Sequence, residues 1–421
     1  MITGIAHINL LVPAGTLDLA EAFYGNTLGL KRVPVPALQT HNLAWFDITP
    51  GGQQVHIAFG ENDAKSRRHP CFKVESPDAL LKLRRQIWEH FEKADQASPQ
   101  EADKPGEESS GARNSYKVVK AITPQVFQAK VSGSNTFVAI KTPPKPPASL
   151  FDNEAKAYKF PSISTSPYIR KLIEEIEEPE SRCLVLEWMD TTLWATRTEP
   201  VDSKLRIFKN VARSCLNGLL AFQDMGGAGP HCHADLNPNN ILVSGFSSPT
   251  PIIKISDLGW TTSTTSQNGP GQVFSGWIQG PALRAPEVWR GADRSTAMDV
   301  WSVGVCLADW VATKAHFGPG GCRIETDMPV EISQAAWSIA KLHKILNAPL
   351  AGSLKDDFNI AWGIAEHVIQ ENYVLDRSFR EQMEQIQMPS DYISFLEKVL
   401  TVNPDRRPSP AEALALPFLQ E

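Results

Sequence analysis

The sequence lacks the features of a membrane protein and of a disulfide-stapled protein. Its 421 residues contain no apolar run of about 18–20 residues, which a helix needs to cross a bilayer. The six cysteines are scattered without a CxxC pair, which argues against a disulfide framework and a thiolate zinc site. The first residues, MITGIAHINLLVPAG, lack the basic start of a signal peptide. We therefore expect an intracellular protein, cytoplasmic or nuclear, with no membrane partner.

A strongly basic surface is also missing. The net charge is −6, and no clustered basic stretch indicates a nucleic-acid-binding face. Residues 93–115 contain no aromatic residue and no Val, Ile, Leu or Met, so this stretch cannot bury apolar surface. It predicts a polar linker that separates an N-terminal domain, 1–92, from a C-terminal domain, 116–421.

The N-terminal domain reads as a strand, a helix and further strands, followed by a second strand and helix. Apolar alternation indicates the strands, and 3.6-residue spacing indicates the helices. The segments are GIAHINLLV (4–12), LDLAEAFYGNTLG (17–29), NLAWFDI (42–48), QQVHIAFG (53–60), HPCFKVES (69–76) and PDALLKLRRQIWEHF (77–91).

This order of elements resembles the glyoxalase and bleomycin-resistance superfamily, which has the vicinal oxygen chelate fold built from paired βαβββ modules. In that family a His on the first strand and a His on the fourth bind a metal ion, and His7 and His56 fall at those places. The second module stops after its helix, so the chain offers no carboxylate as third ligand. Two His alone make a weak divalent site. The alternatives are strand residues without a metal, or a site completed by strands from another chain.

The C-terminal domain contains a polar loop, HCHADLNPNNIL (231–242), with the residue types of phosphoryl transfer. Asp235 could accept a proton or orient a hydroxyl, and Asn240 could bind Mg²⁺ through its amide oxygen. Such loops are also common as plain surface loops, so the neighbouring motifs decide. Asp257 follows a strand-like IIKIS, and FVAIK places Lys141 at the end of a strand upstream. Glu154 follows Lys141 and would pair with it if both were buried.

The order and spacing of Lys141, Glu154, Asp235, Asn240 and Asp257 resemble those of protein kinases. The family resemblance covers about 116–421 and implies a small lobe, 116–189, and a large lobe, 190–421. It implies that Glu187 and Met189 in LVLEWM offer backbone groups to the adenine of ATP. It also implies an ion pair between the glutamate of an Ala-Pro-Glu triplet, Glu287, and Arg407.

A rival resemblance is to small-molecule kinases such as aminoglycoside phosphotransferases, which share an HGDxxxxN-like loop. Those enzymes lack the Ala-Pro-Glu triplet, the DVWS helix with Asp299, and the final RPS, and this chain has all three. The resemblance is therefore to Ser/Thr protein kinases, with a weak likeness to SR-protein kinases of the CMGC group in DLG and in Leu283–Arg284.

Four departures from the kinase pattern bear on activity. The three glycines of the phosphate-covering loop fall on Val119, Ala121 and Pro124, and proline has no N–H to offer. Ala234 replaces the Arg that receives an activation-loop phosphate, so we expect that phosphorylation of this segment is not the activating switch.

The third and fourth departures concern the acceptor side of the predicted site. Asn237 stands where Ser/Thr kinases carry a Lys, and Gly280 stands where they carry a Thr. Asn keeps a hydrogen-bond donor near the catalytic Asp but loses the positive charge.

The sequence thus predicts an α+β protein: a bilobal protein-kinase-like fold preceded by an incomplete βαβββ-βα domain. The first hypothesis is an ATP- and Mg²⁺-dependent protein Ser/Thr kinase with an unknown protein substrate. Its roles are catalytic for Asp235, Lys141 and Glu154, ATP-binding for Lys141, Glu187 and Met189, and metal-binding for Asn240 and Asp257. The alternatives are a pseudokinase scaffold, or a metalloenzyme centred on His7 and His56.

Overall fold

The computed structural model describes most of the chain, and the described ranges have gaps between them. The described residues are 7–35, 42–48, 52–60, 77–99, 102, 109–110, 115–144, 149–177, 182–225, 229–264, 278–324, 328–349 and 351–420. The chain divides into two compact units, residues 1–142 with 178–181, and residues 143–177 with 182–421.

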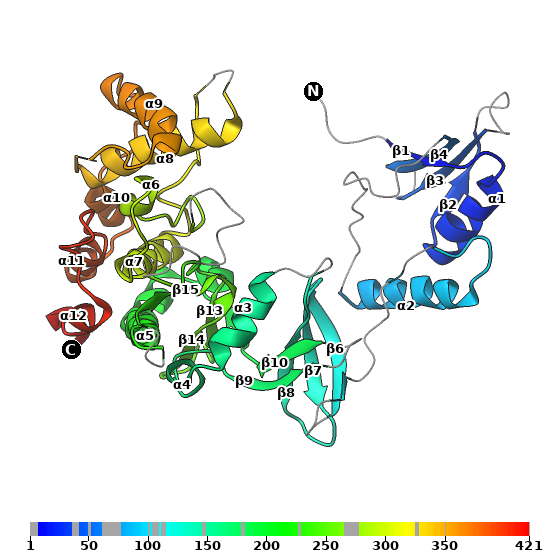
Figure 1. Cartoon of the computed structure of the whole chain (residues 1–421), viewed down its shortest axis with the longest axis horizontal. Helices are drawn as coiled ribbons and strands as arrows, with labels where there is room; N and C mark the ends of the chain where they lie inside the picture. Colours follow the sequence, from blue (N-terminus) through cyan, green and yellow to red (C-terminus); the bar gives the residue numbers. More distant parts are fainter. Residues whose placement is uncertain are drawn as a thin grey trace. The chain divides into compact units, whose positions relative to one another are not determined.

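The first unit begins with a four-stranded sheet in the order β1-β4-β3-β2, in which β1 and β4 are parallel and the other pairs are antiparallel (Figure 1). Its elements are β1 (His7–Val12), α1 (Leu17–Ala20), the π-helical η1 (Glu21–Thr27), β2 (Lys31–Val33), β3 (Leu43–Asp47) and β4 (Gln54–Phe59). Alternate residues of β3 and β4 form the core, and Phe46 and Ile57 are fully buried. The predicted βαβββ order is therefore present, while the predicted strand 69–76 lies outside the described residues.

The long amphipathic helix α2 (Pro77–Lys93) follows and contacts β6. Pro77 suits the first helical position because the N–H that it lacks would be unpaired there. Arg84 of this helix lies over the Phe127 ring, 5.6 Å from its centroid. The strands of this part are β5 (Ser109–Ser110), β6 (Ser115–Thr123), β7 (Val126–Val131) and β8 (Phe137–Lys141). Each of these strands pairs with the next in an antiparallel manner.

The second unit starts with a helix and a two-stranded antiparallel pair and continues as a large helical body (Figure 1). Its first elements are α3 (Ser149–Tyr158), α4 (Pro161–Ser164), β9 (Leu172–Ile176), β10 (Cys183–Glu187), β11 (Thr191–Thr192), η3 (Trp194–Thr198) and α5 (Val201–Leu220). Short strands then carry the polar loops: β12 (His231–Cys232), β13 (Ile241–Ser244), β14 (Ile252–Ile255), η4 (Leu258–Trp260) and β15 (Thr262–Ser263). β13 pairs with β11 and β14, and β12 with β15, all antiparallel.

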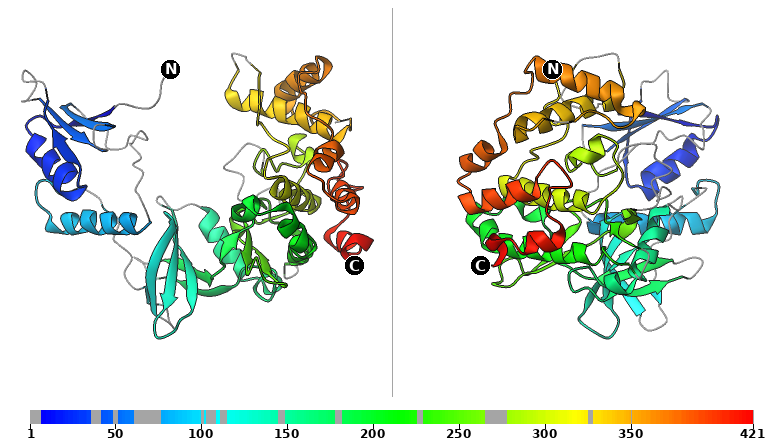
Figure 2. Two further views of the ribbon diagram at one scale, coloured as in Figure 1. Left: turned by 180° about the vertical axis from the view of Figure 1, so that it is seen from behind. Right: turned by 60° about the vertical axis from the view of Figure 1, so that its left-hand side comes forward.

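The remaining elements are helical, and α8 and α9 lie side by side in both views of Figure 2. They are α6 (Pro286–Trp289), α7 (Ala297–Ala312), α8 (Val330–Leu346), η6 (Asp356–Phe358), α9 (Asn359–Gln370), α10 (Phe379–Gln385), α11 (Ser390–Val399), α12 (Pro410–Leu414) and α13 (Pro417–Gln420). Helix α7 is predominantly apolar and is buried along nearly its whole length, as expected for the central helix of a domain.

A buried lysine ties α5 to the end of α7. The Lys204 side chain is 1% exposed, and its ammonium donates hydrogen bonds to four oxygens: Arg197 O, Trp310 O, Val311 O and Thr313 Oγ1. Two of these are carbonyls of the last turn of α7, where backbone acceptors are not fully used within the helix. The charge and the dipole of α7 attract each other, so this contact holds α5 against the C-terminal end of α7.

No helix in the described parts of the chain is long and apolar enough to span a membrane.

Candidate active site

The predicted catalytic loop lies between β12 and β13, and its polar side chains converge on Asp235. Asn240 donates from Nδ2 to the Asp235 carbonyl at 2.9 Å and to Asp235 Oδ2 at 3.1 Å. Asn237 donates to the same two oxygens at 3.1 and 3.4 Å. These bonds orient the Asp235 carboxylate, and they leave Asn240 Oδ1 without a partner among the described residues. An amide oxygen held in this way suits a hard cation such as Mg²⁺.

His233 links this loop to the end of β14. Its ring is fully buried, with Nε2 donating to the Ser256 carbonyl at 3.0 Å and Nδ1 accepting the Asp235 N–H at 3.3 Å. Burial lowers the pKa of His233, so the ring is neutral and serves as a structural bridge.

Asp299 near the start of α7 anchors the loop backbone. Its two carboxylate oxygens accept the N–H groups of His233, at 2.6 Å, and Ala234, at 3.1 Å. Ala234 has a positive φ of 65°, an uncommon conformation for a residue with a Cβ. Burial raises the pKa of Asp299 to about 7. The two hydrogen bonds hold the strained backbone directly before Asp235.

Asp257 follows β14 and also adopts a left-handed conformation, with φ 62° and ψ 74°. The preceding residue, Ser256, donates both its N–H and its hydroxyl to the Asn240 carbonyl, at 2.8 and 3.0 Å. The chain therefore holds Asp257 and Asn240 in adjacent segments, as a shared metal site requires.

Helix α3 is fastened to the residues after Asp257 by one side chain. Asn153 donates to the carbonyls of Gly259 and Thr261, each at 2.8 Å. The next residue in the helix is Glu154, whose side chain is 1% exposed. Glu154 thus belongs to the same part of the second unit as Asp257, whereas Lys141 ends β8 in the first unit.

The predicted hinge residues differ in what their backbones already bind. The N–H of Glu187 donates to the Lys171 carbonyl at 2.9 Å, and its carbonyl accepts from Arg170 Nε at 2.8 Å. The Glu187 carboxylate is held by Lys254 at 2.7 Å. In contrast, the backbone N–H and carbonyl of Met189 form no hydrogen bond with any of the described residues. Met189 is therefore open to a ligand, and the Glu187 carbonyl already has a donor.

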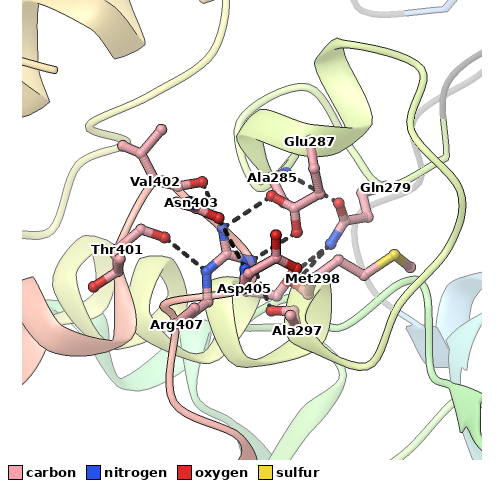
Figure 3. Close-up of polar contacts among 11 residues, drawn as sticks. Gln279, Ala285, Glu287, Ala297, Met298, Thr401, Val402, Asn403, Asp405 and Arg407 are labelled. Carbon is pink, nitrogen blue, oxygen red and sulfur yellow. Dashed lines mark hydrogen bonds and ion pairs between the residues drawn. The ribbon is translucent and has the colours of Figure 1, made fainter. Parts of the chain in front are cut away.

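Glu287 and Arg407 form the ion pair that the sequence predicted, as Figure 3 shows. The guanidinium donates from both terminal nitrogens to the two carboxylate oxygens, at 2.7 and 2.9 Å. Its other hydrogen bonds go to the carbonyls of Thr401, Ala297 and Val402. Nearly all polar groups of this buried pair are thus satisfied, which a buried charge needs.

The model of the protein kinase domain matches residues 123–419. The chain belongs to the protein kinase family. Among curated proteins, the mitogen-activated protein kinase spk1 of Schizosaccharomyces pombe is 29% identical over 248 residues, 58% of this chain and 59% of that protein. Extracellular signal-regulated kinase 2 of Dictyostelium discoideum is 26% identical over 259 residues, 60% of this chain and 63% of that protein.

A third relative, serine/threonine-protein kinase ICK of Rattus norvegicus, is 24% identical over 260 residues, 60% of this chain and 36% of that protein. The chain therefore spans less than two thirds of the length of these three relatives. The kinase model begins at residue 123, so it does not reach the N-terminal sheet.

At the place of the glycine-rich loop, this member of the family has a tight hairpin. Pairing between β6 and β7 continues to Thr123 and Val126, which leaves only Pro124 and Gln125 in the turn. Thr123 Oγ1 accepts the N–H groups of Gln125 and Val126, at 3.3 and 3.0 Å. The turn amides are thus engaged by the protein itself, and a phosphate would have to displace them.

The other departures leave open space. An added Cβ at Gly280 would meet no heavy atom of the described residues within 4 Å. Residues 265–277, the Ser/Thr-rich part of the activation segment, lie outside the described residues. After them, Gln279 accepts the Ala285 N–H and donates to the Met298 carbonyl (Figure 3), which positions the Ala-Pro-Glu triplet.

In the N-terminal sheet, His7 and His56 lie together as a stack. Their ring centroids are 4.1 Å apart with an interplanar angle of 8°, and Trp45 stacks on the other side of His56 at 4.2 Å. His56 Nε2 also bonds to the Gln54 side chain at 3.0 Å. In the described residues, no group of three or more His, Cys, Asp or Glu side chains could hold a metal ion. The likeness to the vicinal oxygen chelate fold rests on the order of elements and remains a prediction.

Sequence reasoning missed Arg170 and Lys254, which hold the backbone and the side chain of Glu187. Both lie in strand-like stretches, SPYIRKL and PIIKIS, where a basic residue is typical of a solvated strand face. Only the pairing of distant segments brings them to the hinge. Arg170 N donates to the Ile255 carbonyl at 2.8 Å, which joins the start of β9 to the end of β14.

Proposed function

We propose that this chain is an ATP-dependent protein kinase that transfers the γ-phosphoryl group to Ser or Thr of a protein substrate. The arrangement of the catalytic loop carries the proposal: Asn240 and Asn237 orient Asp235, and Ser256 joins Asn240 to the segment of Asp257. Phosphoryl transfer depends mainly on positioning and charge neutralisation, and these contacts supply the positioning.

The metal-binding roles fall to Asn240 and Asp257. Oxygen ligands suit Mg²⁺, and the amide oxygen of Asn240 remains available because Asn240 Nδ2 is bound to Asp235. When bound, Mg-ATP supplies the transferable phosphoryl group and the positive charge that neutralises the phosphates. Lys141 is proposed to hold the α- and β-phosphates and Glu154 to position Lys141, as in the family that the chain belongs to.

Asp235 orients the acceptor hydroxyl and takes its proton. The hydroxyl oxygen forms a bond to the γ-phosphorus while the bond between that phosphorus and the bridging oxygen breaks. The electron pair leaves with that bridging oxygen on ADP. The neutral His233 and the carboxylate of Asp299 touch none of these atoms; they fix the backbone that presents Asp235.

A second candidate is a pseudokinase that binds partners without turnover. The hairpin at Pro124 favours it, because its amides are already hydrogen-bonded where a phosphate-covering loop is expected. The loss of positive charge at Asn237 favours it too. Gly280 in place of the Thr of other family members also favours it, because that Thr is expected to contact the catalytic loop.

Transfer of radioactive phosphate from Mg-ATP to an array of Ser- and Thr-containing peptides distinguishes the two. The parent is compared with Asp235→Ala and with Asp293→Ala, a control at an exposed carboxylate. We expect transfer by the parent and the control, and a loss of roughly 100-fold or more in Asp235→Ala. Equal signals from the parent and Asp235→Ala would assign the signal to contamination and favour the pseudokinase.

A further inference from the structure

Arg170, a cation of the second unit, binds one of the backbone groups that the hinge was predicted to offer to adenine, the carbonyl of Glu187. Arg170 precedes β9, and its Nε donates a 2.8 Å hydrogen bond to the carbonyl of Glu187. Its own backbone is fixed because its N–H donates to the Ile255 carbonyl at 2.8 Å. The guanidinium is thus held on the hinge from a strand that is itself bound to the segment before Asp257.

The rest of Glu187 turns away from Arg170. The carboxylate of Glu187 accepts hydrogen bonds from Lys254, at 2.7 and 3.0 Å, and from the Lys171 N–H at 3.2 Å. Within the described ranges, no carboxylate lies within ion-pair distance of Arg170. Its two terminal NH₂ groups form no hydrogen bond to any described residue. Arg170 therefore brings unused donors to the hinge.

Arg170 keeps its positive charge, because a guanidinium is effectively always protonated in a protein. Burial lowers the pKa of Arg170, and the nearby Tyr158, Glu154, Glu187 and Asp257 oppose that effect. A guanidinium has no acceptor atom, so every group that it presents to a ligand is a donor.

Donors at this position change which purine the hinge fits. All three bases have an acceptor at N7, but adenine presents an amino donor at C6, whereas guanine and hypoxanthine present an acceptor, O6. An arginine fork can therefore bind O6 and N7 of the 6-oxo purines in a bidentate manner. The Glu187 carbonyl can still accept a second hydrogen bond, so the binding of adenine is weakened but not prevented. The open backbone groups of Met189 remain available to any of these bases.

We propose that Arg170 makes the nucleotide site of this kinase prefer purines with an oxo group at C6, guanine or hypoxanthine, over adenine. This inference rests on the proposed function, because it concerns the base of the phosphoryl donor. The phosphates, the metal ligands and Asp235 keep the same roles with any of these nucleotides. GTP and ITP are therefore expected to be better donors than ATP.

The test is binding of Mg-ATP, Mg-GTP and Mg-ITP to the full chain by isothermal titration calorimetry. We expect the parent to bind ITP and GTP about tenfold more tightly than ATP. In Arg170→Leu the Glu187 carbonyl is released, so ATP should gain about tenfold and the 6-oxo purines should lose about tenfold. ITP lacks the 2-amino group of GTP. If both nucleotides bind more tightly than ATP by a similar factor, the preference is due to the oxo group at C6.

Arg206→Leu is the matched control, because Arg206 also donates to backbone carbonyls, those of Phe246 and Ser248, far from the hinge in sequence. It should keep the preference of the parent. If Arg170→Leu does not unfold cooperatively, Arg170→Lys keeps the charge, loses the fork, and should reduce the preference severalfold.

The outcomes separate this inference from the proposed function. Equal affinity of the parent for ATP and the 6-oxo purines, or an unchanged preference in both Arg170 variants, overturns the role of Arg170 and leaves the kinase proposal intact. Absence of binding by all three nucleotides to the parent and to the Arg170 variants overturns the proposed function itself.

Discussion

The carboxylate of Glu287 and the guanidinium of Arg407 meet in a bidentate ion pair, with 3% and 0% of their side chains exposed. Replacing Arg407 by Ala leaves a buried carboxylate without its partner, so Arg407→Ala should lower the free energy of unfolding by about 3–5 kcal/mol. Chemical denaturation measures this. Arg380→Ala is the matched control at an exposed Arg–Glu pair and should cost less than about 1 kcal/mol. Similar losses in the two variants would show that burial of the first pair does not matter.

Asp299 should make the stability depend on pH. Its pKa is raised by burial from 3.8 to about 7, so between these values the folded chain binds more protons than the unfolded chain. The contribution of this group to stability is therefore largest at low pH and falls as pH rises through 7. Between pH 5 and pH 8 the unfolding free energy of the parent, relative to Asp299→Asn, should fall by at most about 3 kcal/mol. Parallel pH profiles of parent and variant would contradict the raised pKa.

The acceptor side of the active site should gain activity from two substitutions. Asn237→Lys places a positive charge beside Asp235, and Gly280→Thr adds a hydroxyl at a position where the new Cβ meets no heavy atom of the described residues within 4 Å. Together they should raise kcat for peptide phosphorylation by about tenfold, because charge developing on the transferred group is better stabilised. Gly320→Thr is the control, since it too has open space. A double variant no faster than this control would show that these positions do not limit the rate.

The stack of His7 and His56 should behave as a packing contact. Two imidazoles at 4.1 Å with nearly parallel planes stabilise the sheet, and a neighbouring carboxylate ligand is lacking among the described residues. Micromolar Zn²⁺ or Co²⁺ should therefore raise the Tm of the parent no more than that of His56→Ala, while His56→Ala loses roughly 1 kcal/mol without metal. A metal-dependent rise of several degrees in the parent alone would revive the metalloenzyme hypothesis.

The local geometry of the catalytic loop could largely be predicted because its residues lie close together in the sequence. Asp235, Asn237 and Asn240 share one loop, so their spacing already fixes which side chains can meet. The Glu287–Arg407 pair joins distant segments, and it was predictable only through the family resemblance. Secondary-structure propensity alone does not indicate which residue Glu287 or Arg407 pairs with.

Arg170 shows why the rest could not be predicted. A basic residue in an apolar stretch looks like the solvated face of a strand, and its meeting with Glu187 depends on the irregular pairing of β9 with β10. The tight hairpin at Pro124 was also not predicted. The missing glycines indicated only weaker phosphate binding, whereas the hydrogen bonds from the turn amides to the Thr123 hydroxyl depend on the folded geometry.

The occupied carbonyl of Glu187 also has a consequence for inhibitor design. A hinge-directed compound usually gains affinity by matching the backbone donors and acceptors in front of it, and here one acceptor is already bound by Arg170. A heterocycle with an acceptor at that position, and a donor–acceptor pair for Met189, would match this edge. In a kinase whose corresponding carbonyl has no bound donor, the acceptor of such a compound would face another acceptor. The compound would lose a hydrogen bond there and bind more weakly.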